Sequence, residues 1–243
     1  MLNIIRLLIC AFFITNAQAQ DVLRVNNSFN SPEFDFFSSI WTEVAKRNGI
    51  DVSIITVPNK RALINTNAGH DHGDAARILN ISKFYPNLVS VPETVYTLEI
   101  MAVTKQKDII IKSVDDLKPY HVAVIRGMKI AEILTSAAWP RSLVKATDYD
   151  SIINLLDKGR IDVAVVDKMG ILNSISHSES DQLHYLHNPP LVSVPLYMQL
   201  HKDSSQYVKP FEKTLKQMKA EGSFQKILKA HTDIDVSSKV RFQ

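Results

Sequence analysis

The stretch Gly159-Arg-Ile-Asp-Val-Ala-Val-Val-Asp167 decides the fold class of this 243-residue chain. Residues 161–166 form a mostly apolar run rich in β-branched side chains, which is typical of a strand buried on both faces of a parallel sheet. Gly159 ends a helix expected over 148–158, and Asp167 can cap a helix expected over 169–176. A helix, a buried strand and a second helix in succession indicate a mixed α/β fold.

The same alternation extends outward from this stretch to both ends of the chain. Further strands are expected at 22–25, 50–57, 88–91, 95–104, 120–125, 143–146 and 192–200, and further helices at 32–48, 59–67, 128–136 and 205–220 and after Gly222. One such series runs to about Thr104 and a second follows it, and the chain returns to the first near Pro195. This order predicts two lobes, with the chain crossing between them twice. The loops at the carboxyl ends of the strands would then line a cleft between the lobes. We expect the polar tail from Thr232 to be loose.

The first 19 residues have the pattern of a cleavable signal peptide. Arg6 precedes an apolar run from Leu7 to Ile14, and Ala17-Gln-Ala19 fits the small-x-small cleavage rule. The apolar run is shorter than the roughly 20 residues that cross a bilayer, so we expect no membrane-embedded segment. Cys10, the single cysteine, lies inside this run, so the mature chain would have neither a disulfide nor a thiolate metal site.

Charge and motif patterns exclude several classes of function. The net charge is +3, and no basic run is interleaved with aromatic residues, which argues against nucleic acid as a partner. No Gly-x-Ser-x-Gly motif supports a nucleophilic serine. His70 and His72, even with His184 and His187, lack a recognisable spacing for a third metal ligand, so we expect no metal and no cofactor.

An arginine stands within a stretch that otherwise resembles a buried strand, His72-Gly-Asp-Ala-Ala-Arg-Ile78. An unpaired buried guanidinium costs several kcal/mol, so Arg77 needs an anionic partner. That partner is either the carboxylate of a ligand, which a planar guanidinium holds with two charge-assisted bonds, or an internal acid, Asp74 or Asp71.

Four motifs in order resemble one known family. They are Ser113-Val-Asp-Asp-Leu-Lys118, Val122-Ala-Val-Ile-Arg-Gly-Met-Lys-Ile-Ala-Glu132, the stretch 159–167, and Lys219-Ala-Glu-Gly-Ser-Phe-Gln-Lys-Ile227. Together they are similar to bacterial extracellular solute-binding proteins of family 3, the periplasmic receptors for amino acids and related solutes. The resemblance covers essentially the whole mature chain. It indicates a divergent member, because Arg77 precedes the position at which the common amino-acid receptors place their clamping arginine.

The resemblance implies a two-lobed periplasmic binding fold of type II that closes about a two-strand hinge. Lobe one would comprise 20–103 and 196–243, and lobe two 104–195. The protein would be a periplasmic monomer that captures a small polar, carboxylate-bearing solute for an ABC-type transporter. Two alternatives remain: a ligand sensor that contacts a sensor kinase, and a dehydratase-like cleft enzyme using Glu93 or Glu99.

The resemblance also assigns candidate ligand-binding residues. An arginine of lobe one would clamp a carboxylate, amides at a helix start of lobe two would assist it, an acid of lobe two would take an ammonium, and the first loop would add a polar contact and an aromatic lid. The matching positions are Arg77, Arg126 with Gly127, Asp167, Asn27 and Phe34, and Lys129 and Tyr96 are further candidates. From the residues alone, Arg126 also fits an exposed turn residue, Asp167 a helix cap, and Phe34 a core residue.

Overall fold

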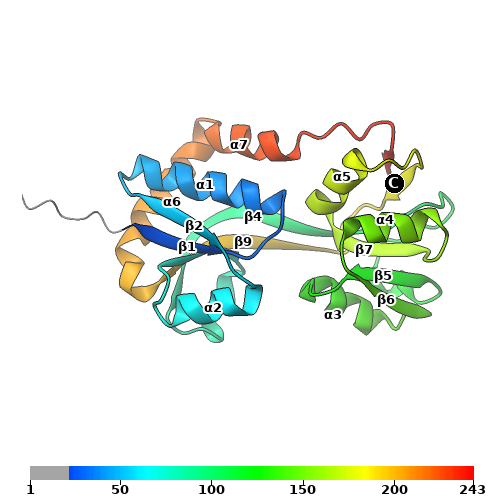
Figure 1. Ribbon diagram of the computed structural model, residues 1–243, viewed down its shortest axis with the longest axis horizontal. Helices are drawn as coiled ribbons and strands as arrows, with labels where there is room; N and C mark the ends of the chain where they lie inside the picture. The colour runs from blue at the N-terminus through cyan, green and yellow to red at the C-terminus, as the bar shows by residue number, and fades with distance from the viewer. Residues whose placement is uncertain (1–21) are drawn as a thin grey trace, which may run out of the picture.

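The computed structural model describes residues 22–243, which form two lobes side by side (Figure 1). The first lobe begins with alternating strands and helices: β1 (Leu23–Asn27), α1 (Glu33–Arg47), β2 (Val52–Thr56), α2 (Asn59–Asn67), β3 (Gly73–Arg77) and the 3-10 helix η1 (Leu79–Lys83). It is completed after the second lobe by η3 (Lys202–Tyr207), α6 (Val208–Ala220) and α7 (Ser223–Thr232).

Two long antiparallel strands, β4 (Leu88–Thr104) and β9 (Val192–His201), run through both lobes and join them. The second lobe contains η2 (Val114–Leu117), β5 (His121–Ile125), α3 (Lys129–Ala138), β6 (Ser142–Ala146), α4 (Tyr149–Asp157), β7 (Val163–Asp167), α5 (Lys168–His177), β8 (His184–Leu186) and β10 (Val240–Phe242). The strand order is β2-β1-β3-β9-β4-β7-β5-β6. The predicted mixed α/β class is confirmed.

The core of the first lobe is organised by the apolar face of α1. Phe36, Phe37, Ile40 and Trp41 are each at most 1% exposed, and the indole nitrogen of Trp41 donates a 3.0 Å hydrogen bond to the carbonyl of Ala75 on β3. Burying each of these side chains contributes roughly 2 kcal/mol or more. The helix is therefore fixed against the sheet, and its first turn is held at the edge that faces the second lobe.

The start of α1 differs from the prediction that Ser31 caps the helix. Pro32 occupies the cap position without a side-chain hydrogen bond, and Ser31 instead donates a 2.7 Å hydrogen bond to Asp35. Glu33 is the first helical residue. The carboxyl group of Glu33 thus lies at the first turn of the helix and at the junction of the lobes.

The chain passes from the first lobe to the second within β4. Residues Ile100–Thr104 of β4 pair with β7, and Met101 and Val103 pack in a core of the second lobe. This half of β4 therefore packs with the second lobe. It does so because apolar side chains on both faces of this half of β4 are buried by second-lobe helices.

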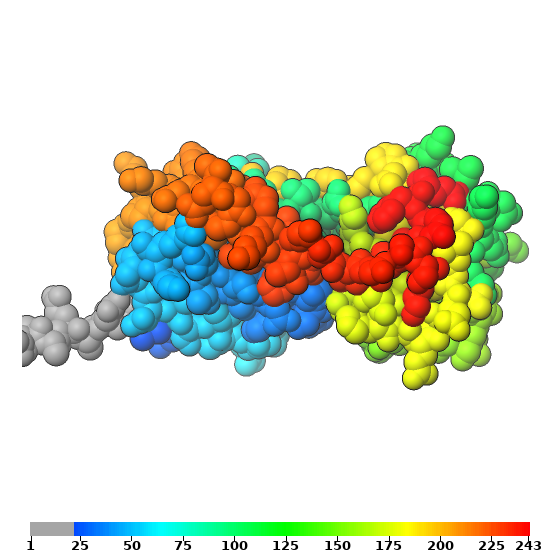
Figure 2. All heavy atoms as spheres, turned by 90° about the horizontal axis from the view of Figure 1, so that it is seen from above, coloured from blue at the N-terminus to red at the C-terminus, as the bar shows by residue number. Residues whose placement is uncertain are grey.

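The tail from Thr232 was expected to be loose, but the structure fixes its end to the second lobe. After α7, residues 233–239 cross to the second lobe, where β10 pairs in parallel with β8 and Val240 joins the core. Gln243 adds hydrogen bonds of 3.0 and 3.1 Å to the carbonyls of Lys107 and Ile109. A third connection between the lobes therefore exists, over the surface seen from above in Figure 2.

The predicted signal peptide lies outside the described residues. Within residues 22–243, no helix has the length and apolar character needed to span a membrane.

Candidate functional site

Strand direction places the functional loops of the two lobes opposite each other. β1, β2 and β3 are parallel, and so are β5, β6 and β7, while the antiparallel pairings through β9 and β4 make the two groups run toward one another. The strand ends at Asn27 and Arg77 therefore face those at Ile125 and Asp167. Facing carboxyl ends of parallel strands are where α/β proteins bind ligands.

Two carboxyl groups from different lobes meet at this junction. Glu33 of α1 and Asp167 at the end of β7 are 5% and 3% exposed. Burial, and then the negative charge of Asp167 and a hydrogen bond with it, raise the pKa of Glu33 to about 10. Glu33 is thus protonated at neutral pH and lies against the side chain of Asp167.

Asp167 is held rigidly by its own lobe. Its Oδ2 accepts a 2.8 Å hydrogen bond from the amide of Gly170, which confirms that it caps α5, and its Oδ1 accepts one from the hydroxyl of Tyr149. Tyr149 lies so close to Gly170 that a side chain there would collide with the phenol ring. Burial and the charges of Asp167 and Glu33 raise the pKa values of Tyr149 and Tyr96, so both phenols stay neutral.

Arg77 has an internal partner, one of the two alternatives that the sequence left open. Its Nη2 bonds both Asp74 Oδ2 and Ser28 Oγ at 2.8 Å. Asp71 pairs instead with Arg24 at 3.3 Å. Asp74 is fully buried, and this burial raises its pKa although Arg77 lowers it.

The ion pair uses only part of the guanidinium. Arg77 Nε and Asp74 Oδ1 are buried and find no hydrogen-bond partner among residues 22–243. A contact between Arg77 and a ligand stays a prediction, and such a contact would have to coexist with Asp74.

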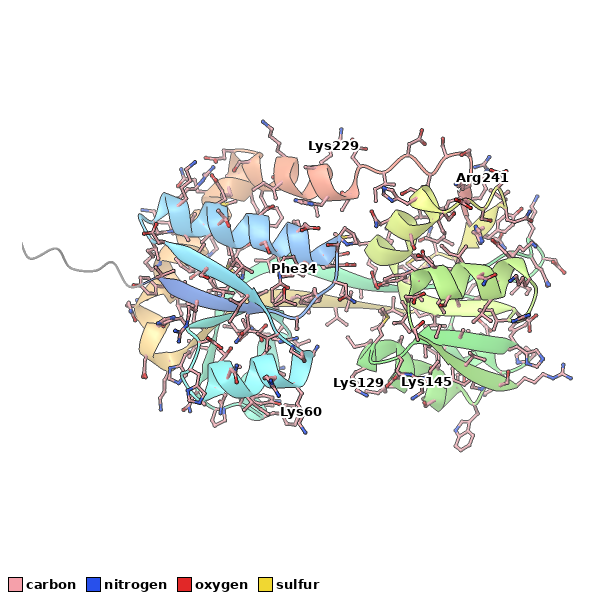
Figure 3. All side chains as sticks on the ribbon, viewed as in Figure 1. Phe34, Lys60, Lys129, Lys145, Lys229 and Arg241 are labelled. Carbon is pink, nitrogen blue, oxygen red and sulfur yellow. The ribbon has the colours of Figure 1, made fainter. Side chains whose placement is uncertain are left out.

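The side chain of Asn27 forms the hydrogen bonds that hold the loop between β1 and α1. Its amide donates hydrogen bonds to the carbonyl of Phe34 at 3.0 Å and to Ser38 at 3.3 Å, and its oxygen accepts one from the amide of Phe29 at 3.2 Å. The Asn27 side chain therefore holds the loop in shape. Phe34 is half-buried near the start of α1, beside the junction (Figure 3). Ligand contact for either residue stays a prediction.

In the turn between β5 and α3, the amide of Gly127 donates its hydrogen bond to a carboxylate of the chain itself. Glu132 Oε1 accepts a 2.9 Å hydrogen bond from Gly127, and Glu132 also pairs with Lys129 at 3.0 Å and Lys145 at 3.5 Å. The Gly127 hydrogen bond, and then Lys129, lower the pKa of Glu132 to about 2. The amide that was predicted to face a ligand anion is thus occupied by the chain's own carboxylate, while Arg126 remains exposed.

Cationic side chains gather on the opposite side of the junction from the acid pair. Lys60 lies in the first turn of α2, Arg126 and Lys129 flank the start of α3, and Lys145 precedes the end of β6. All four are exposed, and we call them the basic rim. Figure 3 shows Lys60, Lys129 and Lys145 on the side of α2 and α3. Glu33 begins α1 and Asp167 immediately precedes α5, and these two helices lie on the other side in Figure 1.

The remaining candidates are placed apart from this junction or paired. Glu93 forms an ion pair with Lys219, and Glu99 pairs with Lys168 at 2.8 Å. His184 bonds Asp157. In the part of the chain that the structure describes, no group of three or more His, Cys, Asp or Glu residues is placed to hold a metal.

Sequence reasoning missed Glu33 and Tyr149. Glu33 fits the acidic first turn of an ordinary helix, and Tyr149 fits a helix start. Their importance arises from a contact with Asp167, which no local pattern records.

Comparison with known proteins supports the two-lobed fold. No family model matches the sequence. An uncharacterised protein of Shewanella oneidensis strain MR-1 is 26% identical over 248 residues, covering 93% of each chain. The ligand-binding core of GluR0 in complex with L-glutamate superposes with a TM-score of 0.72 at 13% identity, over 87% of this chain and 98% of that one.

A second solved structure is an amino acid ABC transporter substrate-binding protein, AbpA from Streptococcus pneumoniae, bound to L-arginine. Its TM-score is 0.66 at 14% identity, over 87% of this chain and 94% of that one. The chain therefore has the two-lobed α/β fold of these ligand-binding proteins.

Proposed function

We propose that this protein is a periplasmic receptor that closes its two lobes on a small zwitterionic solute, such as an amino acid, and delivers it to an ABC-type transporter. The observation that carries the proposal is the separation of charge at the junction. An acid pair lies on one side, and the basic rim lies on the other.

The chemistry follows from this separation. An ammonium group is matched by Asp167 and Glu33, which together hold negative charge in a buried place. A carboxylate is matched by Arg126 and Lys129 of the basic rim. Micromolar binding requires about 8 kcal/mol, which a few charge-assisted bonds in a closed cleft can supply.

The solved relatives support the same class of ligand. L-glutamate is bound in the GluR0 core and L-arginine in AbpA, and AbpA is a transporter component. Capture and delivery need no covalent step. Glu93 and Glu99, the acids that a cleft enzyme would use, are each paired with a lysine.

Calorimetry and thermal shift with the standard amino acids test the proposal. For each solute that binds, the matching amine without the carboxylate and the matching acid without the ammonium are measured too. We expect the zwitterion to bind at least about tenfold more tightly than either analogue, a difference of about 1.4 kcal/mol. At a hundred times Kd it should stabilise the protein by about 2.7 kcal/mol.

Two variants locate the ammonium site. Asp167→Asn keeps the helix cap but removes the charge, and we expect it to weaken binding of the zwitterion. Asp181→Asn, in an exposed loop, is the matched control and should bind normally. A well-folded protein that responds to none of the amino acids would contradict the proposed function.

A further inference from the structure

A cavity of about 560 Å³ lies at the junction of the lobes, next to the end of β7, and its lining includes Lys168 and the further candidate Tyr96. Its floor is the middle of β4, residues Thr94–Thr97 and Glu99. Its walls are the first turns of α5, the inner face of α7 and the start of the tail at Thr232 and Ile234. None of Asn27, Arg77, Arg126 or Gly127 lines it.

The cavity is built from parts that belong to different lobes. α7 packs on α1 in the first lobe, and α5 packs on α4 in the second. β4 passes beneath both helices, and the tail crosses above the junction to reach β10 (Figures 1 and 2). An occupant would therefore touch both lobes, and a change in the angle between them would change the fit.

The lining combines an apolar wall with two lysines, each of which has a carboxylate partner. The apolar part comprises Val95, Met169, Leu172, Phe224, Leu228 and Ile234. Three ionisable acids and bases line the cavity, and two of them are lysines: Lys168, 2.8 Å from Glu99, and Lys219. Glu93, which pairs with Lys219, is not part of the lining.

We propose that this cavity is an accessory site for an amphipathic anion, a molecule with an apolar body and one acidic group. Its volume is within the range of about 300–1,000 Å³ that is typical of small-molecule sites, and the lining pairs an apolar surface with a few polar groups. The apolar body packs between α5 and α7, and the acidic group takes the place of the Glu99 carboxylate beside Lys168. Because the occupant spans both lobes, it shifts the population toward the lobe arrangement that fits it.

The probe for the test is 1-anilinonaphthalene-8-sulfonate, an amphipathic anion that fluoresces in apolar surroundings. We expect saturable one-site binding to the native protein, with displacement by decanoate. Leu172→Trp fills the cavity from α5, and we expect it to weaken probe binding by at least about tenfold. His177→Trp places the same side chain on an exposed position of the same helix and should bind the probe like the native protein.

A second variant tests whether the protein recognises the acidic group of the ligand. It also keeps the proposal testable if Leu172→Trp fails to fold. Lys168→Gln should lose the preference for decanoate over 1-decanol that the native protein shows. Equal probe binding by the native protein and Leu172→Trp overturns the proposal, as does an equal preference for decanoate in the native protein and Lys168→Gln. Amino-acid binding is measured in parallel, so a failure of this site is distinguished from a failure of the proposed function.

Discussion

Single buried titratable groups set the chemistry of the junction, and Glu33 is the clearest case. The residue is 5% exposed, its Oε1 has no hydrogen-bond partner among residues 22–243, and Asp167 is its neighbour from the other lobe. A carboxyl in such a place keeps its proton, because ionisation would leave two negative charges in a buried site.

Glu33→Gln should remove a dependence of stability on pH. The pKa of Glu33 is about 10 in the folded protein and close to 4.5 when unfolded, so the folded state holds the extra proton between these values. The stability from this group is complete below about pH 4.5 and is lost as pH rises toward 10. We expect unfolding free energy to fall by about 1 kcal/mol per pH unit more in the native protein than in the variant.

Denaturant unfolding at pH 6, 7, 8 and 9 measures the difference. Glu43→Gln, on an exposed position of the same helix, is the control and should follow the native profile. Parallel profiles for the native protein and Glu33→Gln would refute the assignment of a raised pKa.

Arg77→Ala should be destabilised by about 3 kcal/mol in urea unfolding, because it leaves the fully buried Asp74 without its cation. The double variant Arg77→Met with Asp74→Asn should recover most of that loss. If Arg77→Ala unfolds like the native protein, the internal ion pair is energetically unimportant, and solute binding by this variant then decides whether Arg77 contacts ligand.

Among the secondary-structure elements, those with a regular spacing of apolar residues could be predicted from the sequence, whereas the shortest strands could not. The helix expected at 59–67 has the observed bounds, because Ala62 and Leu63 mark its buried face. Two separate strands were expected at 88–91 and 95–104, but β4 is continuous, with register shifts around Thr94. β8 and β10 were missed, because three-residue strands gain their stability from pairing rather than from a local pattern.

The same distinction separates the candidate site residues. The capping role of Asp167 follows from local sequence, whereas its contact with Glu33 depends on how the lobes meet. The resemblance placed Gly127 before an anion, but Glu132, one turn into α3, already accepts its hydrogen bond. Local patterns locate strand ends reliably, and tertiary packing decides which groups there remain available.

Removal of residues 233–243 should weaken the second lobe in particular. The tail contributes the burial of Val240 and the pairing of β10 with β8, which together should amount to about 3 kcal/mol. Hydrogen exchange should therefore become faster at β8, while β2 of the first lobe stays protected. Gln243→Ala, which removes only the side-chain contacts of the terminus, should have a smaller effect. Equal exchange at β8 in the truncated and native proteins would show that β10 does not stabilise the lobe.

For the whole molecule, the acid pair places a proton between the two lobes. Glu33 comes from the first lobe and Asp167 from the second, so the proton of Glu33 lies where the lobes meet. An ammonium group that enters between them would replace that proton. At pH 7, removing a proton from a group with a pKa of about 10 costs about 4 kcal/mol, which the two new charge-assisted contacts must offset.

Solute binding should therefore release close to one proton at pH 7, and the affinity for a zwitterion should rise by up to about tenfold per pH unit between pH 6 and 8. Calorimetry in two buffers with different ionisation enthalpies measures the released proton directly. Glu33→Gln has no proton to release, so its affinity should be constant over this range. Binding that is independent of pH in the native protein would mean that the ammonium meets Asp167 alone, with Glu33 remaining neutral as a hydrogen-bonding partner in the closed form.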